Sequence, residues 1–346
     1  MAYISFKPSD YFNTTNYSGN SSTQTITTGL ANDMVWIKDT ASAINNEIFD
    51  TVRGATKYLV TNSNGTENSA HSDNLTAFGS TGFTLGANAG NDINHTGHDY
   101  SSMNWRMGTT TGIAGSADIT PSAYSFNQTA GMSIIKYTGS AGAIRTVLHG
   151  LGSAPDLIII KQLTSSTNAW VVGADAIVSN WGGVLTLNTT AAIFTNAYFG
   201  GAVPDATKFS ISNTSEVNSS GTYVAYCFKS IKGFSAIGNY TGNGNADGSF
   251  VYTGFEPAMV ITKSVGGIAA WGLYTTHNVG YNPTNKPLAP DSNGGLNSTY
   301  VIDILSNGFK PRHADAQLNA SGTTYMYYAV AKNPIVGSNG TTGVAR

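Results

Sequence analysis

The stretch Gly29-Leu-Ala-Asn-Asp-Met-Val-Trp-Ile-Lys38 sets the fold, because this chain of 346 residues contains versions of it three times. The second version is Leu151-Gly-Ser-Ala-Pro-Asp-Leu-Ile-Ile-Ile-Lys161, and the third is Gly254-Phe-Glu-Pro-Ala-Met-Val-Ile-Thr-Lys263. Each has a turn-forming lead, a largely apolar run and a lysine. A short apolar run bounded by Gly or Pro is typical of a β-strand covered on both faces. The lysine is a common residue where such a strand ends in water.

Other landmarks recur in the same order around the three lysines. They are Tyr17, Tyr137 and Tyr240 in Tyr-Ser/Thr-Gly; the bulky aromatics Phe49, Trp170 and Trp271; the corners Leu59–Asn62, Leu185–Asn188 and Leu288–Asp291; Phe83, Phe209 and Phe309; and Asn94, Asn218 and Asn319 in Asn-x-x-Gly. The lysines are 123 and then 102 residues apart, and Trp105, Phe228 and Val330 have the same spacing. Equal spacing at both ends of the unit predicts tandem copies of one fold.

The composition favours an all-β protein. Charged residues make up 10% of the chain, well below the roughly 25% usual for globular proteins. Strand-forming residues alternate with turn residues, and windows rich in helix formers are missing. We expect three tandem antiparallel β-sandwich units of jelly-roll or lectin type. The expected boundaries are 1–105 with an N-terminal arm, a Gly/Ser/Thr-rich linker at 106–131, 132–230, 231–334 and a C-terminal tail at 335–346.

Charge and hydropathy exclude several classes of partner. The formal net charge is −2 and no basic cluster is present, so we expect no nucleic-acid partner. No apolar run reaches the roughly 20 residues that cross a bilayer, so we expect no membrane insertion. Residues 1–12 lack the apolar core of a signal peptide. The chain is expected to be made in a cytoplasm and to remain there or leave by cell lysis.

Catalysis would require a cluster of nucleophile, base and acid, and the repeats share none. We therefore expect no enzyme activity, no catalytic residue, no metal and no cofactor. His95 and His98 lie in an Asn-x-x-Gly turn that we interpret as solvated, because lone spacing is a weak metal signal. The calcium-loop-like tract 243–248 is interpreted as a hairpin turn, because Gly254 occupies the position of the bidentate acid. Asp50 and Arg53 are expected to pair at a corner.

A cysteine and four aromatic side chains are the remaining candidates for a functional role. The one cysteine, Cys227, lies in an apolar run and is interpreted as a core residue. Four aromatics lie outside the repeat frame in Gly/Asn-rich connections and are candidate ligand-facing residues: Trp181, Tyr198, Tyr281 and Tyr300. An exposed aromatic beside Asn or Asp suits a sugar. The alternative interpretation is that these aromatics fill loop cores or subunit contacts.

Several tracts resemble a family of bacteriophage virion proteins that is common among marine tailed phages. They are Phe6–Thr14, Val35–Lys38, Asp50–Lys57, Gly82–Gly86, His149–Gly152, Tyr223–Phe228, Tyr240–Gly244 and Val336–Gly340. The resemblance covers essentially the whole chain. Copy one departs from the repeat at Asn32, where the other copies have Pro155 and Pro257. Members are tail-fibre or structural proteins, so the resemblance implies a place in the virion and carries over no catalytic residue.

The resemblance leaves three functions to weigh. The first is a virion protein of tail-fibre or spike type that contributes to host attachment, with loops recognising a cell-surface polysaccharide. The second is a capsid decoration or tail adaptor that contacts only other virion proteins. The third and weakest is a polysaccharide depolymerase, because no carboxylate pair recurs. A homo-oligomer is expected, with a trimer suggested by analogy.

Overall fold

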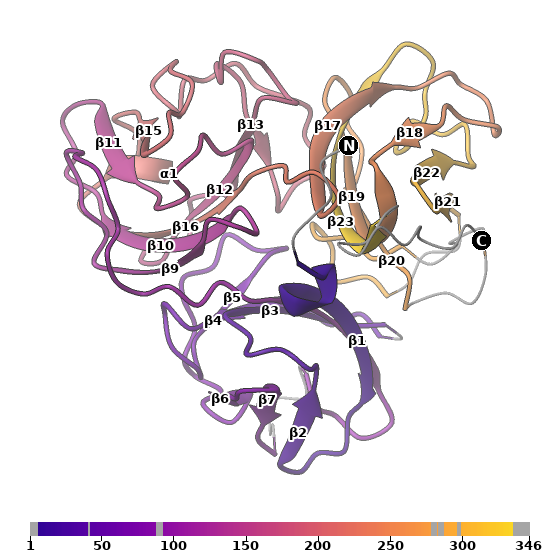
Figure 1. Ribbon diagram of the computed structural model, residues 1–346, viewed down its shortest axis with the longest axis horizontal. Coiled ribbons are helices and arrows are strands. Elements are labelled where there is room, and N and C mark those ends of the chain that lie inside the picture. The colour runs from indigo at the N-terminus through magenta and orange to yellow at the C-terminus, as the bar shows by residue number, and fades with distance from the viewer. Residues whose placement is uncertain are drawn as a thin grey trace.

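The computed structural model describes residues 6–40, 42–87, 93–277, 282, 287–295 and 299–334. The regular secondary structure of these residues is almost entirely β-strand, in antiparallel sheets, as predicted. The two described helices are short, η1 (Pro8–Asp10) and α1 (Ser215–Asn218). Figure 1 shows three lobes arranged around a common centre, with residues 12–105 in lobe 1, 123–228 in lobe 2 and 235–334 in lobe 3. No helix among the described residues has the length and apolarity to span a membrane.

Lobe 1 contains a larger and a smaller sheet. The larger sheet has, in spatial order, β1 (Phe12–Ser18), β8 (Asp99–Trp105), β3 (Met34–Asp39), β4 (Asn46–Asp50) and β5 (Tyr58–Val60). The smaller sheet has β2 (Gln24–Thr27), β7 (Gly82–Leu85) and β6 (Leu75–Phe78).

Lobe 2 repeats this arrangement. Its larger sheet has β14 (Leu185–Thr186), β13 (Val171–Ala174), β12 (Leu157–Gln162), β16 (Thr222–Phe228), β10 (Met132–Thr138) and β9 (Ala123–Asn127). Its smaller sheet has β11 (Arg145–Leu148) and β15 (Lys208–Ile211). The predicted linker 106–131 is therefore partly wrong, because its residues 123–127 form β9, the edge strand that pairs with β10.

Lobe 3 has the same order again. Its larger sheet has β17 (Ser235–Thr241), β23 (Thr324–Pro334), β19 (Phe255–Ser264) and β20 (Gly272–Thr275). Its smaller sheet has β18 (Val251–Tyr252), β22 (Gly308–Pro311) and β21 (Ile302–Leu305). The tract 243–248 joins β17 to β18, which belong to different sheets, so the predicted hairpin turn is wrong. That each lobe is a domain able to fold alone stays a prediction.

The apolar strands that opened the sequence analysis, β3, β12 and β19, are buried on both faces, as predicted. In β3, Val35 and Ile37 pack into the sandwich core of lobe 1, between its two sheets. Met34 and Trp36 face the opposite way and join a core shared by all three lobes. Alternate residues of a strand point to opposite faces, so a continuous apolar run serves two cores at once.

The shared core lies where the three larger sheets face one another, and we call it the central core. It includes Trp36 from lobe 1, Tyr226 from lobe 2 and Tyr328 from lobe 3. A cavity of about 20 Å³ among these apolar side chains is the size of roughly one water molecule. Close packing of this kind holds the lobes as one body. The smaller sheets lie at the periphery, as Figure 1 shows.

The tyrosine and asparagine landmarks have the same role in each lobe. The rings of Tyr17 and Tyr100 stack with centroids 5.1 Å apart, and the pairs Tyr137–Tyr223 and Tyr240–Tyr325 stack at the same separation. The Asn-x-x-Gly asparagines are buried. Asn94, for example, accepts a bond from the backbone N–H of Asn20 and donates to the carbonyl of Gly86. These landmarks therefore close each lobe.

Candidate functional site

The three landmark lysines lie inside the protein, and the expectation that they end strands in water is wrong. Lys38, Lys161 and Lys263 each have 0% of their surface exposed. A buried ammonium group needs acceptors to replace water. Backbone carbonyls supply them, and in every lobe one of these carbonyls belongs to a neighbouring lobe.

The contacts between lobes run in one cyclic direction. The Lys38 Nζ donates to the carbonyl of Asn293 in lobe 3 at 3.0 Å. The Lys161 Nζ donates to the carbonyl of Asn64 in lobe 1 at 2.9 Å. The Lys263 Nζ donates to the carbonyl of Thr190 in lobe 2 at 3.2 Å. Each accepting residue lies two positions after the corner Asn or Asp of its lobe. The three lysines therefore close the lobes into a ring, and we call these contacts the lysine clamps.

Each lysine also bonds within its own lobe. Lys38 donates to the carbonyl of Ile44 at 2.6 Å, and Lys161 donates to the carbonyl of Asn168 at 2.9 Å. Burial lowers the pKa of all three lysines to about 8, because the charged form loses its hydration. The nearby Asp39 partly opposes this shift at Lys38, and Asp291 does so at Lys263.

A second set of contacts follows the same cyclic direction. The indole Nε1 of Trp170 donates to the carbonyl of Val60 in lobe 1 at 3.1 Å, and that of Trp271 donates to the carbonyl of Thr186 in lobe 2 at 2.9 Å. In lobe 1 the corresponding residue is Asn46, whose side chain donates to the carbonyl of Ala289 in lobe 3 at 3.1 Å.

The predicted correspondence of Phe49 with the two tryptophans is wrong. The register places Lys38 opposite Asn46. In the other lobes the pairs Ile160–Val171 and Thr262–Gly272, extended by one residue, place Lys161 opposite Trp170 and Lys263 opposite Trp271. Phe49 instead packs into the sandwich core of lobe 1. The corner residues confirm the correct match, because Asn62, Asn188 and Asp291 accept bonds from the backbone N–H of Asn46, Trp170 and Trp271 respectively.

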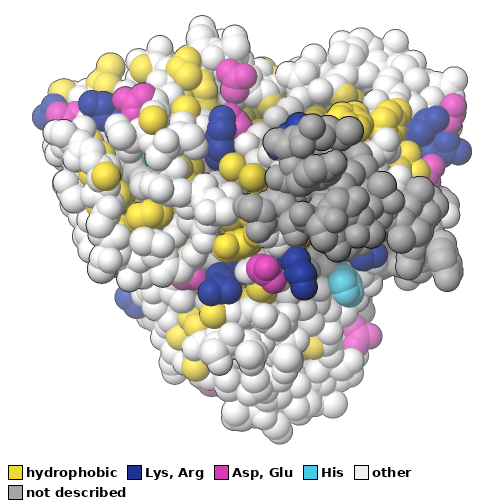
Figure 2. Space-filling view, in the orientation of Figure 1, with side chains coloured by type: hydrophobic (Ala, Val, Ile, Leu, Met, Phe, Trp, Pro, Cys, Tyr) yellow, Lys and Arg dark blue, Asp and Glu magenta, His cyan; other side chains and the backbone are white. Residues whose placement is uncertain are grey.

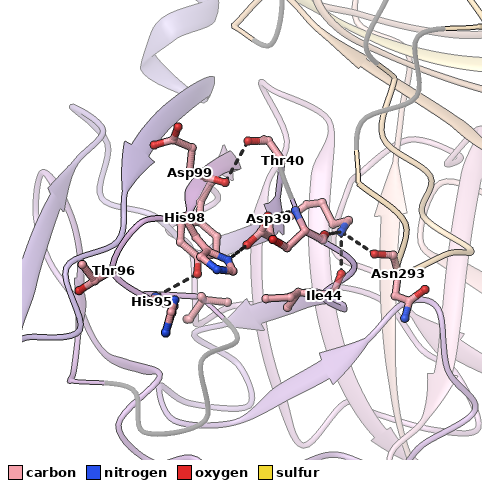
Figure 3. Close-up of polar contacts among 12 residues, drawn as sticks. Asp39, Thr40, Ile44, His95, Thr96, His98, Asp99 and Asn293 are labelled. Atoms are coloured by element: carbon pink, nitrogen blue, oxygen red, sulfur yellow. Dashed lines mark hydrogen bonds and ion pairs between the residues drawn. The ribbon is translucent and has the colours of Figure 1, made fainter.

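Directly after the Asn-x-x-Gly turn of lobe 1, His98 pairs with Asp39, and the other lobes lack this pair. The ring Nδ1 of His98 lies 2.6 Å from Oδ2 of Asp39, which is fully buried. The rings of His95 and His98 meet edge to face with centroids 4.6 Å apart. Figure 3 shows His98 and Asp39 beside Ile44 and Asn293, which are acceptors in the Lys38 clamp. The prediction of a wholly solvated turn is wrong at His98.

The chemistry available to this pair is limited by its neighbours. The Thr40 hydroxyl, drawn beside it in Figure 3, donates to the backbone carbonyl of Asp99 at 2.9 Å. Oδ1 of Asp39 accepts a bond from the backbone N–H of Ser42 at 2.6 Å. Among the described residues, no three His, Cys, Asp or Glu side chains are placed to hold one metal ion. The pair fixes the end of β3 next to the clamp.

The predicted pair of Asp50 and Arg53 is confirmed, and it forms part of a contact between lobes. The Arg53 Nε lies 2.6 Å from Oδ2 of Asp50, and both side chains are fully buried. The Tyr226 hydroxyl of lobe 2 donates to the same carboxylate oxygen at 2.8 Å. The predicted core position of Cys227 is confirmed as well, and burial raises the pKa of its thiol to about 12.

The four candidate ligand-facing aromatics do not form one site. Trp181 is 1% exposed, and its ring packs edge to face on Phe199 inside lobe 2. Tyr198 is buried in the same core. A ligand-facing role is therefore wrong for Trp181 and Tyr198, because their connection folds back over the sandwich. Tyr300 is half-buried against His313, and Tyr281 lies outside the described residues.

The exposed aromatics lie elsewhere, on lobe 3. Phe250 is 47% exposed and Tyr252 is 62% exposed, whereas Val251 between them is buried. Neither exposed aromatic was predicted, because neither belongs to a landmark that the three copies share. The sequence did contain a signal. Phe250 and Tyr252 flank Val251, which pairs with Phe309, and the corresponding positions in lobe 1 are occupied by Thr25 and Thr27.

Comparisons with curated proteins and with solved structures find no match. A family model described as a domain of unknown function, DUF7483, matches residues 7–334. The match spans all three lobes and both sets of contacts that close the ring. The chain belongs to the DUF7483 family.

Proposed function

We propose that this chain is a structural component of a bacteriophage virion, of tail-fibre or spike type, that contributes to attachment to the host surface. The observation that carries the proposal is the closed ring of lysine clamps. A part that works outside the cell must keep its shape without chaperones. Resistance of that kind depends on how slowly the structure opens. Three lobes locked in a ring open only when several contacts break together.

The sequence supports the same role. The tracts that resemble marine phage virion proteins include Val35–Lys38 of β3 and Tyr223–Phe228 of β16, which contribute Trp36 and Tyr226 to the central core. The polar groups buried among the described residues support a non-enzymatic role, because Asp39, Asp50 and Arg53 are engaged in contacts that hold corners and lobes together.

The expected oligomer also follows as part of this proposal. One chain already supplies three similar lobes, the arrangement that a trimeric particle part obtains from three chains. The chain therefore suits a position on a particle axis, with the smaller sheets directed away from the centre. Association of this chain into a further trimer stays a prediction, and its partners in the particle would be other virion proteins.

The experiment is to purify phage particles from a lysate on a density gradient and to search them for this chain by peptide mass spectrometry. Antibody labelling in the electron microscope then locates it. We expect a constant copy number per particle and labelling at the tail. Abundant chain in the lysate with none in infectious particles would overturn the proposal.

A second measurement separates attachment from a purely architectural role as decoration or adaptor. Excess purified chain is added to host cells before infection. We expect it to slow phage adsorption, because it occupies the same surface ligand. Chain that is present in particles but leaves adsorption unchanged would favour the architectural role. Release of reducing sugar from host polysaccharide would contradict the non-enzymatic role.

A further inference from the structure

The outward surface of the smaller sheet in lobe 3 differs from those of lobes 1 and 2. Val251 of β18, Ile302 of β21 and Phe309 of β22 point into the sandwich core. Because side chains alternate along a strand, their neighbours point outward. We call the outward set Phe250, Tyr252, Asp303 and Lys310, with Asp247 and Arg312 at its end, the lobe 3 outer face.

The aromatic part of this face is unusually exposed for this molecule. The described residues include five large exposed hydrophobic side chains, and two of them, Phe250 and Tyr252, lie here on one two-residue strand and its flank. A Cβ at Gly308 would lie 2.0 Å from the Val251 carbonyl oxygen and 3.0 Å from a carbon of the Phe250 ring, so the glycine permits the close approach of both. The ring therefore lies along the sheet. Figure 2 shows apolar and charged side chains adjoining on this lobe.

The charged part of the face is neutral as a whole. Asp247 lies 2.8 Å from the Lys310 Nζ and 2.5 Å from the Arg312 Nη1, and the Arg312 Nε lies 3.4 Å from Asp303. The hydrogen bond from Lys310 lowers the pKa of Asp247, with a further contribution from Arg312, so that its carboxylate is charged. Asp247 keeps 67% of its side chain exposed. The network therefore holds donors and acceptors side by side at the surface.

The other lobes lack an exposed aromatic pair at these positions, where lobe 1 has Thr25 and Thr27 and lobe 2 has Thr146 and the buried Leu148. The registers match Val251 and Phe309 with Ile26 and Phe83 in lobe 1 and with Val147 and Phe209 in lobe 2. The residues after the three phenylalanines are Lys310, Thr84 and Ser210. The buried side of the sheet is thus common to all lobes, and the lobe 3 outer face is not. The exposed side chains of the lobe 3 outer face therefore do not contribute to the packing that the three lobes share.

We propose that the lobe 3 outer face binds a neutral polysaccharide. A pyranose ring has an apolar C–H face that stacks on aromatic rings, and hydroxyl groups that bond to carboxylates and guanidinium groups. Phe250 and Tyr252 supply the first kind of contact, and Asp247 and Arg312 supply the second. This assignment rests on the proposed attachment function, for which it names the class of ligand.

Other partners fit the face less well. A polyanion would need free cations, whereas Lys310 and Arg312 are paired with Asp247 and Asp303. A stable protein partner would need roughly 800 Å² on this side, and two aromatic rings bury about 150–250 Å² each. The mixed surface of two rings and a neutral charged network matches a sugar chain.

The test measures binding of the full chain to a panel of neutral polysaccharides (dextran, mannan, galactan) and anionic ones (alginate, polygalacturonate), by affinity electrophoresis and calorimetry. We expect the chain to bind at least one neutral polymer. Tyr252→Ala should weaken that binding about tenfold, the loss of one stacked ring. Asp247→Asn should weaken it as well. Matched controls are Thr27→Ala, at the corresponding position of lobe 1, and Ile268→Ala, which is 79% exposed elsewhere on lobe 3.

Three results would overturn this assignment: no binding to any neutral polymer, equal binding by Tyr252→Ala, or salt-sensitive binding to the anionic polymers alone. All of these variants change exposed side chains, so unaltered thermal unfolding is expected. Failure here is distinct from failure of the proposed function. Chain found in particles but inert toward neutral polymers removes the sugar site alone, and chain that binds a neutral polymer but is absent from particles removes the virion role alone.

Discussion

The ammonium group of Lys161 donates a hydrogen bond over 2.9 Å to the backbone carbonyl of Asn64, 97 positions earlier in the chain and in another lobe. Lys38 and Lys263 make the corresponding bonds to the two remaining corners. A lysine at a strand end in water would keep its ammonium group hydrated and would make no contact with another lobe. These lysines join each lobe to its neighbour, so the same residue type that marks the repeat also assembles it.

Removing one clamp should destabilise the whole chain. Lys161→Met keeps the length of the side chain but leaves the carbonyls of Asn64 and Asn168 without a donor. A buried acceptor left unpaired costs about 1–3 kcal/mol. We expect a loss of about 2–4 kcal/mol in the free energy of unfolding in urea. Lys232→Met, at an exposed lysine, is the control and should change it by less than about 0.5 kcal/mol. Equal stability of the two variants would contradict the clamp.

The indole contact between lobes 1 and 2 can be isolated by comparing two tryptophans. Trp170→Phe removes the bond to the carbonyl of Val60, whereas Trp36→Phe removes a buried Nε1 for which the structure shows no acceptor. Both lose a similar volume from the central core. We expect Trp170→Phe to be the more destabilising by about 1 kcal/mol, the net value of one hydrogen bond. Urea unfolding of both variants measures the difference, and a larger loss in Trp36→Phe would argue against the contact.

Asp291 stands where the other lobes have Asn62 and Asn188, and this predicts a stabilising substitution. Burial raises the pKa of Asp291 to about 6, although its bonds to backbone N–H groups oppose the shift. Above pH 6 the folded chain holds a buried carboxylate that the unfolded chain would hydrate. Asp291→Asn should therefore raise stability at pH 7 by about 1–3 kcal/mol and have little effect near pH 4. The converse change, Asn188→Asp, should lower stability at pH 7. A destabilised Asp291→Asn at pH 7 would refute this explanation.

The buried lysines and tyrosines together predict an alkaline optimum of stability. The lysine pKa values of about 8 lie below the unfolded value of 10.5, so between these two pH values the unfolded chain binds more protons and stability rises with pH. Burial raises the pKa of Tyr17, Tyr137 and Tyr240 well above 10.0. Above pH 10 the unfolded chain therefore loses tyrosine protons that the folded chain keeps, and stability falls.

The free energy of unfolding, measured in urea from pH 7 to pH 11, should thus rise by at least about 1 kcal/mol and then decline. The matched control is Lys161→Met, whose profile should rise less steeply because one of the three lysines no longer titrates. A midpoint that falls steadily from pH 7 to pH 9 would show that the lysines keep their ordinary pKa.

The all-β fold and the doubly buried strands were predictable from the sequence. Apolar runs such as that of β3 have few other solutions, and the spacing of Trp105, Phe228 and Val330 marked the same position in three sheets. The burial of Lys38 was not predictable, because its acceptors are carbonyls of Ile44 and of the distant Asn293. Backbone acceptors leave no trace in residue identity.

The errors about aromatics have a related origin. Phe49 was aligned with Trp170 because a search by residue type favours another aromatic, whereas the position is occupied by Asn46, a different side chain with the same donor role. Trp181 was expected at the surface because Gly and Asn surround it. Its backbone φ of 57° turns the chain so that the ring enters the core. Loop composition indicates exposure of the backbone but not the direction of a large side chain.

The last strand of each lobe, β8, β16 or β23, lies between two strands made earlier, as the orders β1-β8-β3, β12-β16-β10 and β17-β23-β19 show. During synthesis the two strands on either side of this position therefore have unpaired edges until the last strand is made. A polypeptide that stops before Thr324 leaves β17 and β19 apart and the central core uncovered. A lobe 3 without β23 exposes both of these sheet edges to proteases and to other chains, so the order of strands makes the stability of the lobe depend on the strand that is made last.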